Sequence, residues 1–423
     1  MAPVPVNSSV SETTLTKNLL ARHGSNVRNF EVFRQLVPLV AREGLTYLNA
    51  SFSPPSNVII HAAINEFNSE ALLSPHPKPQ WQQNTEKVRQ LIARYINADP
   101  TSVAFMRDTT EGLGSFIRSI NFTPGDNVVI LDSEHPNHAY GWMALRDAGL
   151  EVRQVPTIAE SEKTGNVVEA NAGTFAPYVD GRTRAIGLSS VMFHSGQKND
   201  IKDICDVYRP KGIHVLVDMT QQVGFATVDV TDLNVSAAAF GFHKGLNCPT
   251  GLAALYVNPD VIKESDPTPP IVGYGSVSNV RGDLLVPSDS IVFHPTARRY
   301  EHLNLGLINV AAAKAWLEFY LDVMGPENLE CHLYSLGDSL RDGCQRLGIK
   351  VVGPESHKAH APHLYILDLH EPKWAEHLRE NHVYVTPYRL GIRVSFGYYN
   401  NSGDVDFLFK VLQAGIDAGI PLQ

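Results

Sequence analysis

Short apolar segments alternate with helical patterns from about residue 85 to residue 257. Most of these segments are apolar on both faces, which is typical of a mainly parallel sheet covered by helices. We predict strands at residues 102–106, 127–131, 151–155, 184–189, 214–218, 237–242 and 253–257, the last two joined by a turn and able to pair antiparallel. We predict helices at 85–97, 110–120 and 138–148. Because ligands of open α/β sheets bind beyond the carboxyl ends of strands, a functional site is expected there.

The pattern changes after a loop-rich stretch at residues 266–294. Two long helices are predicted at 307–322 and 327–346, and short strands then alternate with helices to the C-terminus. Those strands are expected near residues 349–352, 364–369, 383–386 and 392–396. The C-terminal part therefore predicts a smaller α+β domain that closes against the large one. We divide the chain into an N-terminal arm and joining segment (1–45), a large domain (46–290) and a small domain (291–423).

The charge balance restricts the class of partner. The 423 residues include 35 basic and 44 acidic side chains, a net charge of −9, whereas nucleic acids and anionic membranes require a basic face. A small anion held in a pocket is still permitted. The four cysteines include no Cys-x-x-Cys pair, so neither a zinc site nor a disulfide framework is indicated. There is no signal-peptide pattern at the N-terminus and no run of 18 apolar residues, so a cytoplasmic protein without a membrane span is expected.

Two charged residues follow apolar strands. Asp218 ends the run His-Val-Leu-Val-Asp, where a carboxylate costs free energy unless it is paired. The alternative is a helix cap or a surface acid. Lys244 follows the segment Ala-Ala-Ala-Phe-Gly-Phe-His, and a buried ammonium is strongly disfavoured there. A neutral or imine-forming lysine removes that conflict, and a lysine that extends to solvent is the alternative.

Three further segments hold candidate binding residues. Thr109 and Thr110 lie between a strand and a helix, where hydroxyls and free N–H groups can bind phosphate, although plain N-capping is the commoner use. His135 follows strand 127–131 and could stack on a flat ring or carry a proton, or it could simply be solvated. Arg393 lies within a short strand, where its guanidinium could bind a substrate carboxylate or form an internal salt bridge.

The order and spacing of these residues form one series. A Thr-Thr-Glu turn, a Glu-His pair, a strand ending in Asp-x-x-Gln, a His-Lys followed by Pro-Thr-Gly and an Arg-Val-Ser strand occur in turn along the chain. This series resembles the class V aminotransferase family of fold type I enzymes, over roughly residues 45–415. That family uses pyridoxal 5′-phosphate and includes cysteine desulfurases, isopenicillin N epimerases and fungal secondary-metabolism enzymes. The resemblance implies an α/β large domain with a mainly parallel seven-stranded sheet and a smaller α+β C-terminal domain.

The resemblance also implies roles for residues around the cofactor. Lys244 would bond covalently to it and later move the Cα proton, and Asp218 would pair with the pyridine nitrogen. Gln221 would reach the phenolic oxygen, and His135 would stack on the ring. The phosphate would be held by Thr109, Thr110 and His243.

Three further residues are assigned to the substrate and to a second subunit. Arg393 would bind the substrate α-carboxylate, and Asn49 resembles part of the family's N-terminal substrate-binding segment. Asn304 falls where relatives place a threonine that reaches the neighbouring subunit's phosphate. A homodimer with shared active sites is therefore implied.

The chain also departs from the family pattern. Residues 382–391 contain no cysteine, although desulfurases carry their nucleophilic cysteine in this region, so a persulfide mechanism is not expected. Gly241 replaces a common phosphate-binding serine, and Phe193 or His194 replaces an asparagine near the cofactor. We therefore expect an enzyme acting at Cα of an α-amino acid bound to the cofactor. A lyase, an epimerase or a C–C bond-forming enzyme, decarboxylative or not, in specialised metabolism is favoured. An aminotransferase is the first alternative, and a non-catalytic binding protein is the second.

Overall fold

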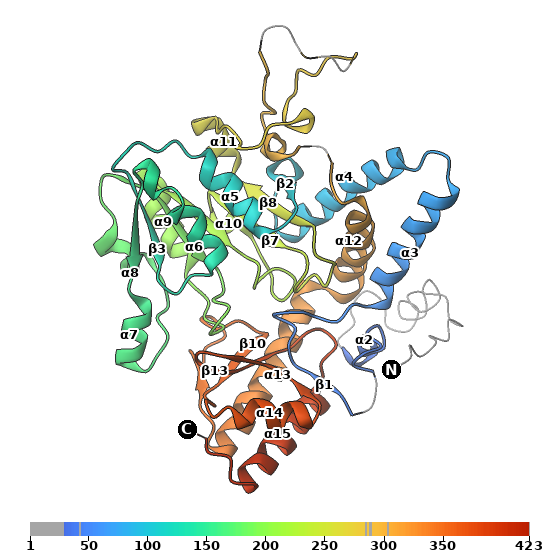
Figure 1. The fold of residues 1–423 in the computed structure, drawn as a ribbon, viewed down its shortest axis with the longest axis vertical. Helices are drawn as coiled ribbons and strands as arrows, with labels where there is room; N and C mark the ends of the chain where they lie inside the picture. Colours follow the sequence, from blue (N-terminus) through green and yellow to red (C-terminus); the bar gives the residue numbers. More distant parts are fainter. Residues whose placement is uncertain (1–28, 42–43, 284–285, 287–289, 303, 423) are drawn as a thin grey trace.

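A seven-stranded sheet forms the centre of the larger part of the protein in this computed structural model, which describes residues 29–41, 44–283, 286, 290–302 and 304–422 (Figure 1). Its strands are β2 (Val103–Met106), β3 (Asn127–Leu131), β4 (Glu151–Val155), β5 (Thr183–Ser189), β6 (His214–Asp218), β7 (Ala237–Gly241) and β8 (Ala253–Val257). They are ordered β2-β8-β7-β6-β5-β3-β4. Only β8 runs against the others, pairing antiparallel with β7 and β2. The predicted mainly parallel sheet is confirmed, and each predicted strand agrees to within one residue.

Alternating side chains pack on the two faces of this sheet. In β6, Val215 and Val217 join one core cluster, and Leu216 joins the other. Helices α5 (Thr109–Ser119), α6 (Pro136–Met143) and α11 (Pro259–Ser265) pack in the cluster with Leu216. The opposite cluster includes α4 (Lys78–Tyr95), α9 (Ile201–Tyr208) and α12 (Leu307–Phe319). The remaining helices of this part are α3 (Val58–Leu73), α7 (Thr157–Thr164), α8 (Ala172–Phe175) and α10 (Val230–Leu233).

The C-terminal elements, orange to red in Figure 1, form a smaller α/β unit beneath the large sheet. Its antiparallel sheet has the order β12-β13-β10-β9. The strands are β9 (Val351–Val352), β10 (Leu364–Leu367), β12 (Thr386–Tyr388) and β13 (Gly391–Ser395), and the helices are α13 (Pro326–Leu347), α14 (Lys373–Glu380) and α15 (Ser402–Asp417). The single strand predicted at 383–386 is wrong. It is divided between β12 and a separate strand β11 (Val383–Tyr384), because these two short strands pair with different partners.

An N-terminal segment crosses to this smaller unit. Strand β1 (Thr46–Tyr47) pairs parallel with β11, and Asn49 forms a parallel bridge with Ser395. Before it lies the short helix α2 (Glu31–Arg34), and most of the predicted N-terminal arm, residues 1–28, is outside the described residues. The domain limits at residues 45 and 290 stay a prediction. In the part of the chain that the structure describes, no helix combines the length and apolar character needed to cross a bilayer.

Candidate functional site

A cavity of about 250 Å³ lies at the carboxyl ends of β2, β3, β5, β6 and β7. Loops that follow parallel strands meet at one edge of the sheet, which brings together residues far apart in the sequence. Seven of the predicted residues line this cavity: Thr109, Thr110, His135, Asp218, Gln221, His243 and Lys244. The other described lining residues are Asp108, Asn137, Ser189, Val191, Phe193 and Thr220. The cavity therefore joins the strand-end motifs into one site.

One end of the cavity has the features of an anion site. Asp108 caps α5, because its carboxylate accepts a hydrogen bond from the backbone N–H of Glu111 at 2.8 Å. The capping alternative thus holds for Asp108, while Thr109 and Thr110 at the helix start line the cavity. The Thr109 hydroxyl lies 2.8 Å from that of Thr220. Hydroxyls and the N-terminus of an eleven-residue helix provide donors for an anion.

The sequence departure at Gly241 has a steric reason. A Cβ atom at this position would lie 2.6 Å from Nδ1 of His243 and 3.2 Å from the hydroxyl oxygen of Thr109. The imidazole of His243 therefore occupies the space in which a serine side chain would lie. His243 also lines the cavity, and burial together with the charge of Lys244 lowers its pKa. This part of the cavity therefore has the imidazole of His243, which can be neutral or charged, and no hydroxyl at position 241.

Asp218 and Lys244 place a carboxylate and an amine in the same cavity. Asp218 ends β6 and is 8% exposed, and its Oδ1 accepts a hydrogen bond from the backbone N–H of Thr220 at 2.9 Å. Burial lowers the pKa of Lys244 from 10.5 to about 8, the charge of Arg393 acts in the same direction, and Asp218 opposes the shift. An amine with that pKa gives up its proton readily near neutral pH, as a nucleophile or proton carrier requires.

His135 forms part of the cavity wall, and Glu134 fixes its backbone through a hydrogen bond. The His135 ring meets Phe193 edge-on, with 4.9 Å between centroids, and burial lowers its pKa. Glu134 is buried and accepts hydrogen bonds from the backbone N–H groups of His135 (2.9 Å) and Ser189 (2.6 Å), as well as from the Ser189 hydroxyl. From the sequence, Glu134 was identified only as the acid of the Glu-His pair and was assigned no role. Its three hydrogen bonds fix the loop that carries His135.

Glu134 is expected to make stability depend on pH. Burial raises the pKa of Glu134 from 4.5 to about 7, so the folded protein holds this proton more tightly than the unfolded chain does. The resulting stabilisation is complete below pH 4.5 and is lost as pH rises through about 7. Between these values the unfolding free energy of the wild type should fall by roughly 3 kcal/mol relative to Glu134→Gln, which does not titrate. Denaturant unfolding of both proteins across this range measures the difference, and a flat or rising difference would contradict the assignment.

Arg393 lies within β13 close to this cavity without being one of its described lining residues. It is 1% exposed, its Nη1 donates to the carbonyl of Phe193 at 3.0 Å, and its guanidinium lies 4.3 Å from the ring centroid of Tyr388. The Nε and Nη2 atoms meet no described acceptor in hydrogen-bonding geometry. The alternative of an internal salt bridge is therefore not observed among the described residues. The N–H groups of these two buried nitrogens remain available for a carboxylate.

Phe193, rather than His194, borders the cavity. Its ring lies between His135 and Tyr388, at 4.9 and 6.0 Å respectively, and its carbonyl receives the Arg393 hydrogen bond. His194 is half-buried with both ring nitrogens enclosed, and burial lowers its pKa to about 4. The departure at this position therefore introduces an apolar aromatic wall next to the guanidinium.

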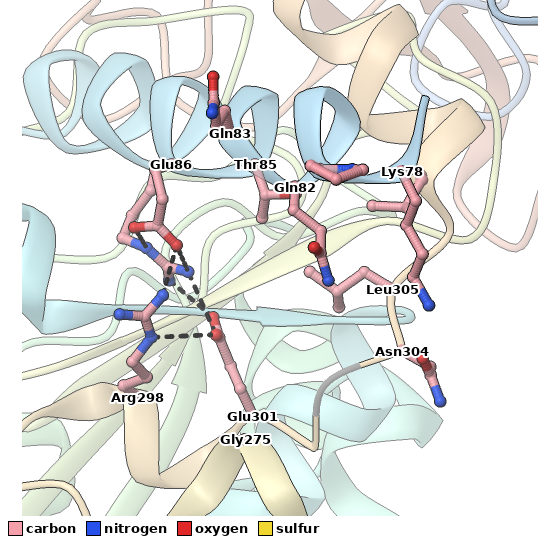
Figure 2. Close-up of a pocket in the computed structure, with 13 residues that line it drawn as sticks. Lys78, Gln82, Gln83, Thr85, Glu86, Gly275, Arg298, Glu301, Asn304 and Leu305 are labelled. Carbon is pink, nitrogen blue, oxygen red and sulfur yellow. Dashed lines mark hydrogen bonds and ion pairs between the residues drawn. The ribbon is translucent and has the colours of Figure 1, made fainter. Parts of the chain in front are cut away.

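The two predicted asparagines have different positions. The Oδ1 of Asn49 accepts a hydrogen bond from the Thr386 hydroxyl at 2.7 Å, and Thr386 is the strand partner of Arg393. Asn49 is thus attached to the strands that carry the guanidinium. Asn304 lines a separate cavity of about 510 Å³, where Figure 2 shows it near Leu305 and apart from the Arg298–Glu86 ion pair. Within one chain, Asn304 is not brought to the cavity of Lys244.

None of the four cysteines is among the described residues that line the site. Cys205, Cys248 and Cys344 are buried, and Cys331 is exposed. Burial raises the pKa of Cys344 to about 12, which suppresses the thiolate that a nucleophile requires. Residues 382–391, where desulfurases carry their cysteine, form strands β11 and β12 and the turn that leads into β13.

Comparisons of the sequence and of the fold with known proteins agree on one family. The profile described as "Aminotransferase class-V" matches residues 53–408. An uncharacterized aminotransferase of Schizosaccharomyces pombe is 49% identical over 94% of this chain and 98% of that protein. The apo structure of a cysteine desulfurase from Thermococcus onnurineus has a TM-score of 0.79 at 19% identity, covering 93% of this chain and all of that one. A C-DES variant with glycine covalently linked to its PLP cofactor has a TM-score of 0.78 at 22% identity, covering 90% and 98%.

Proposed function

Because the chain belongs to the class V aminotransferase family and its cofactor is pyridoxal 5′-phosphate, we propose that it is an enzyme acting at Cα of an α-amino acid. The observation that carries this proposal is the convergence of three groups at one sheet edge. These groups are the amine of Lys244 with its lowered pKa, the carboxylate of Asp218 and the α5 N-terminus with its threonines. Each suits a different part of the cofactor.

The donor and acceptor set of the cavity fits pyridoxal phosphate. Thr109, Thr110 and His243 offer hydrogen-bond donors to a phosphate, and Asp218 offers a carboxylate to a protonated ring nitrogen. Lys244 offers the amine that bonds to an aldehyde. The bound cofactor supplies an electron sink that stabilises negative charge at Cα.

The protein residues then orient the substrate and move its proton. Arg393 holds the α-carboxylate through the N–H groups of Nε and Nη2, which fixes how the bonds of Cα lie relative to the cavity. Lys244, once released from the cofactor, accepts a proton from Cα or returns one to it. His135 covers one face of the cavity, and Glu134 fixes its loop.

We propose that the protein makes or breaks a bond at Cα as a lyase, an epimerase or a C–C bond-forming enzyme of specialised metabolism. Its C–C bond formation would occur with or without loss of CO₂. The absence of a cysteine among the described lining residues argues against a persulfide-forming desulfurase. An aminotransferase is the second candidate, favoured by the name of the 49% identical relative. A non-catalytic binding protein is disfavoured, because Lys244, Asp218 and Arg393 would then have no reason to converge.

Spectral titration of the holoenzyme with a panel of amino acids in deuterated water tests the reaction type. Deuterium at Cα of recovered substrate is expected for an epimerase, and loss of the side chain or of CO₂ is expected for lyase or decarboxylative chemistry. A stoichiometric new amino acid from an added keto acid would instead establish an aminotransferase. Release of persulfide sulfur from cysteine by the wild type, lost in a variant with all four cysteines replaced by serine, would contradict the desulfurase argument.

We further propose that two copies form a cytoplasmic homodimer with shared sites, in which Asn304 of one copy reaches the phosphate end of the other. The position of Asn304 on a separate cavity supports this, because it has no function in the Lys244 cavity of its own chain. Mixing inactive Lys244→Ala and Asn304→Ala subunits tests the arrangement. A mixed dimer restores one complete site only if the two residues act in trans.

A further inference from the structure

The carboxamide of Gln221 borders the cavity and is contacted from outside it by two distant parts of the chain. Its Nε2 donates to the backbone carbonyl of Ser51 at 3.1 Å, and its Oε1 lies 3.4 Å from Nε2 of His363. Ser51 follows β1, and His363 directly precedes β10. Both contacts therefore come from segments associated with the smaller sheets.

The contact with Ser51 determines which way the carboxamide faces. A backbone carbonyl only accepts hydrogen bonds, so the NH₂ group of Gln221 must face Ser51 and its oxygen must face His363. His363 must then carry its proton on Nε2, because an unprotonated nitrogen would repel that oxygen. The second N–H of Gln221 is left for a ligand in the cavity.

The surroundings of His363 provide no other use for its polar atoms. The ring is fully buried and stacks on Phe225, with 3.7 Å between centroids and 3° between planes. Burial, reinforced by the charge of Arg393, holds its pKa well below 6.5, so the ring stays neutral. Its Nδ1 has no partner among the described residues. A phenyl ring would stack equally well without burying this unpaired nitrogen, so the N–H···O contact with Gln221 is what an imidazole adds.

We propose that His363 is a positioning residue, which fixes the Gln221 carboxamide so that one N–H faces the phenolic oxygen of the bound cofactor. The inference rests on the proposed function, because it assigns Gln221 to that oxygen. It also couples the small sheet to the cofactor, since His363 precedes β10 and Ser51 is tied to β13 by the hydroxyl–hydroxyl hydrogen bond to Ser395 at 2.9 Å.

The visible absorbance of the lysine-bound cofactor provides a readout that does not depend on turnover. A hydrogen-bond donor to the phenolic oxygen reduces the negative charge on that oxygen. This charge otherwise stabilises the proton on the nitrogen through which Lys244 is bonded to the cofactor, so loss of the donor raises the pKa of that nitrogen. In His363→Phe, which retains the stacking on Phe225, we expect the pH midpoint of the absorbance change to rise by about one unit. His363→Leu is the second apolar variant if His363→Phe does not accumulate. His363→Gln, whose side-chain N–H can reach the same oxygen, should titrate as the wild type does.

A matched control is His360→Phe, since His360 is also a buried histidine stacked on an aromatic ring, that of Tyr365, but hydrogen bonds to the carbonyl of Ala361. Its midpoint should stay that of the wild type. Gln221→Leu should shift the midpoint at least as far as His363→Phe, and combining the two should add nothing.

The possible outcomes separate this inference from the function on which it rests. If the wild type has no visible band, the cofactor assignment itself is wrong, and if Lys244→Ala retains the band, another amine bonds to the cofactor. If Gln221→Leu shifts the midpoint and the apolar His363 variants do not, only the positioning role of His363 is overturned. The same holds if His363→Phe produces an equal further shift in the Gln221→Leu background, because the effect would then not pass through Gln221.

Discussion

Lys244→Ala is expected to abolish the visible absorbance of the lysine-bound cofactor and to reduce turnover by at least about 10²–10⁴-fold. The physical reason is the enclosed amine, whose pKa is about 8 in place of 10.5. At pH 7 this shift increases the neutral, nucleophilic fraction of the amine by roughly 300-fold. The visible band should therefore form on adding pyridoxal phosphate to the apoprotein at a rate that rises with pH up to about 8.

The matched control for this substitution is Lys202→Ala. Lys202 lies on α9 in a surface ion pair with Asp206 at 2.6 Å, so its loss should change neither the band nor the rate. Absorbance spectra of both variants test the loss of the band, and single-turnover measurements test the loss of rate. A Lys244→Ala protein that still forms the band would show that another amine bonds to the cofactor.

Arg393→Lys is expected to raise the substrate Kd by about 10–100-fold and to leave the cofactor band intact. A hydrogen bond to a charged group contributes about 1.5–3 kcal/mol, and a lysine cannot reproduce the two-pronged geometry of a guanidinium. The aromatic ring of Tyr388 and the carbonyl of Phe193 can still receive an ammonium, so the fold should tolerate the exchange.

Arg341→Lys is the control for the arginine substitution. Arg341 has similar contacts away from the cavity, with its guanidinium 5.4 Å from the Tyr365 ring centroid and a hydrogen bond to the carbonyl of Pro354. Spectral titration with an amino-acid substrate gives Kd for both variants. Unchanged affinity in Arg393→Lys and in Arg393→Ala would remove the carboxylate-binding role.

Sequence patterns predicted the sheet well because its strands are apolar on both faces and lie between helical spacers. Helix α3 was not predicted, since only Ile59 and Ile60 are buried in it while Leu72 and Leu73 are highly exposed. A one-sided apolar pattern was therefore missing. Sequence periodicity could not predict the strand pairing in the smaller unit either, because β11 pairs with β1, an element over 300 residues earlier.

The candidate site was predictable where its chemistry depends on residues directly after strands. Asp218, His135 and Lys244 each follow an apolar run that locates the strand end. Residues that act from behind the cavity gave weaker signals. The contact between His363 and Gln221 spans 142 residues, and neither position shows a local pattern that indicates the other.

The crossing of the N-terminal segment has a consequence for the order in which the protein can mature during synthesis. The hydrogen bond between Ser51 and Ser395 spans 344 residues of chain. At about 5–20 residues per second, the ribosome needs roughly 20 to 70 s to make the intervening chain. The large sheet can assemble during that interval, whereas the wall that holds Gln221 and Arg393 must wait for the last strand. We therefore expect nascent chains that end before residue 395 to bind pyridoxal phosphate more weakly than the full chain, because they lack the Ser51–Ser395 hydrogen bond.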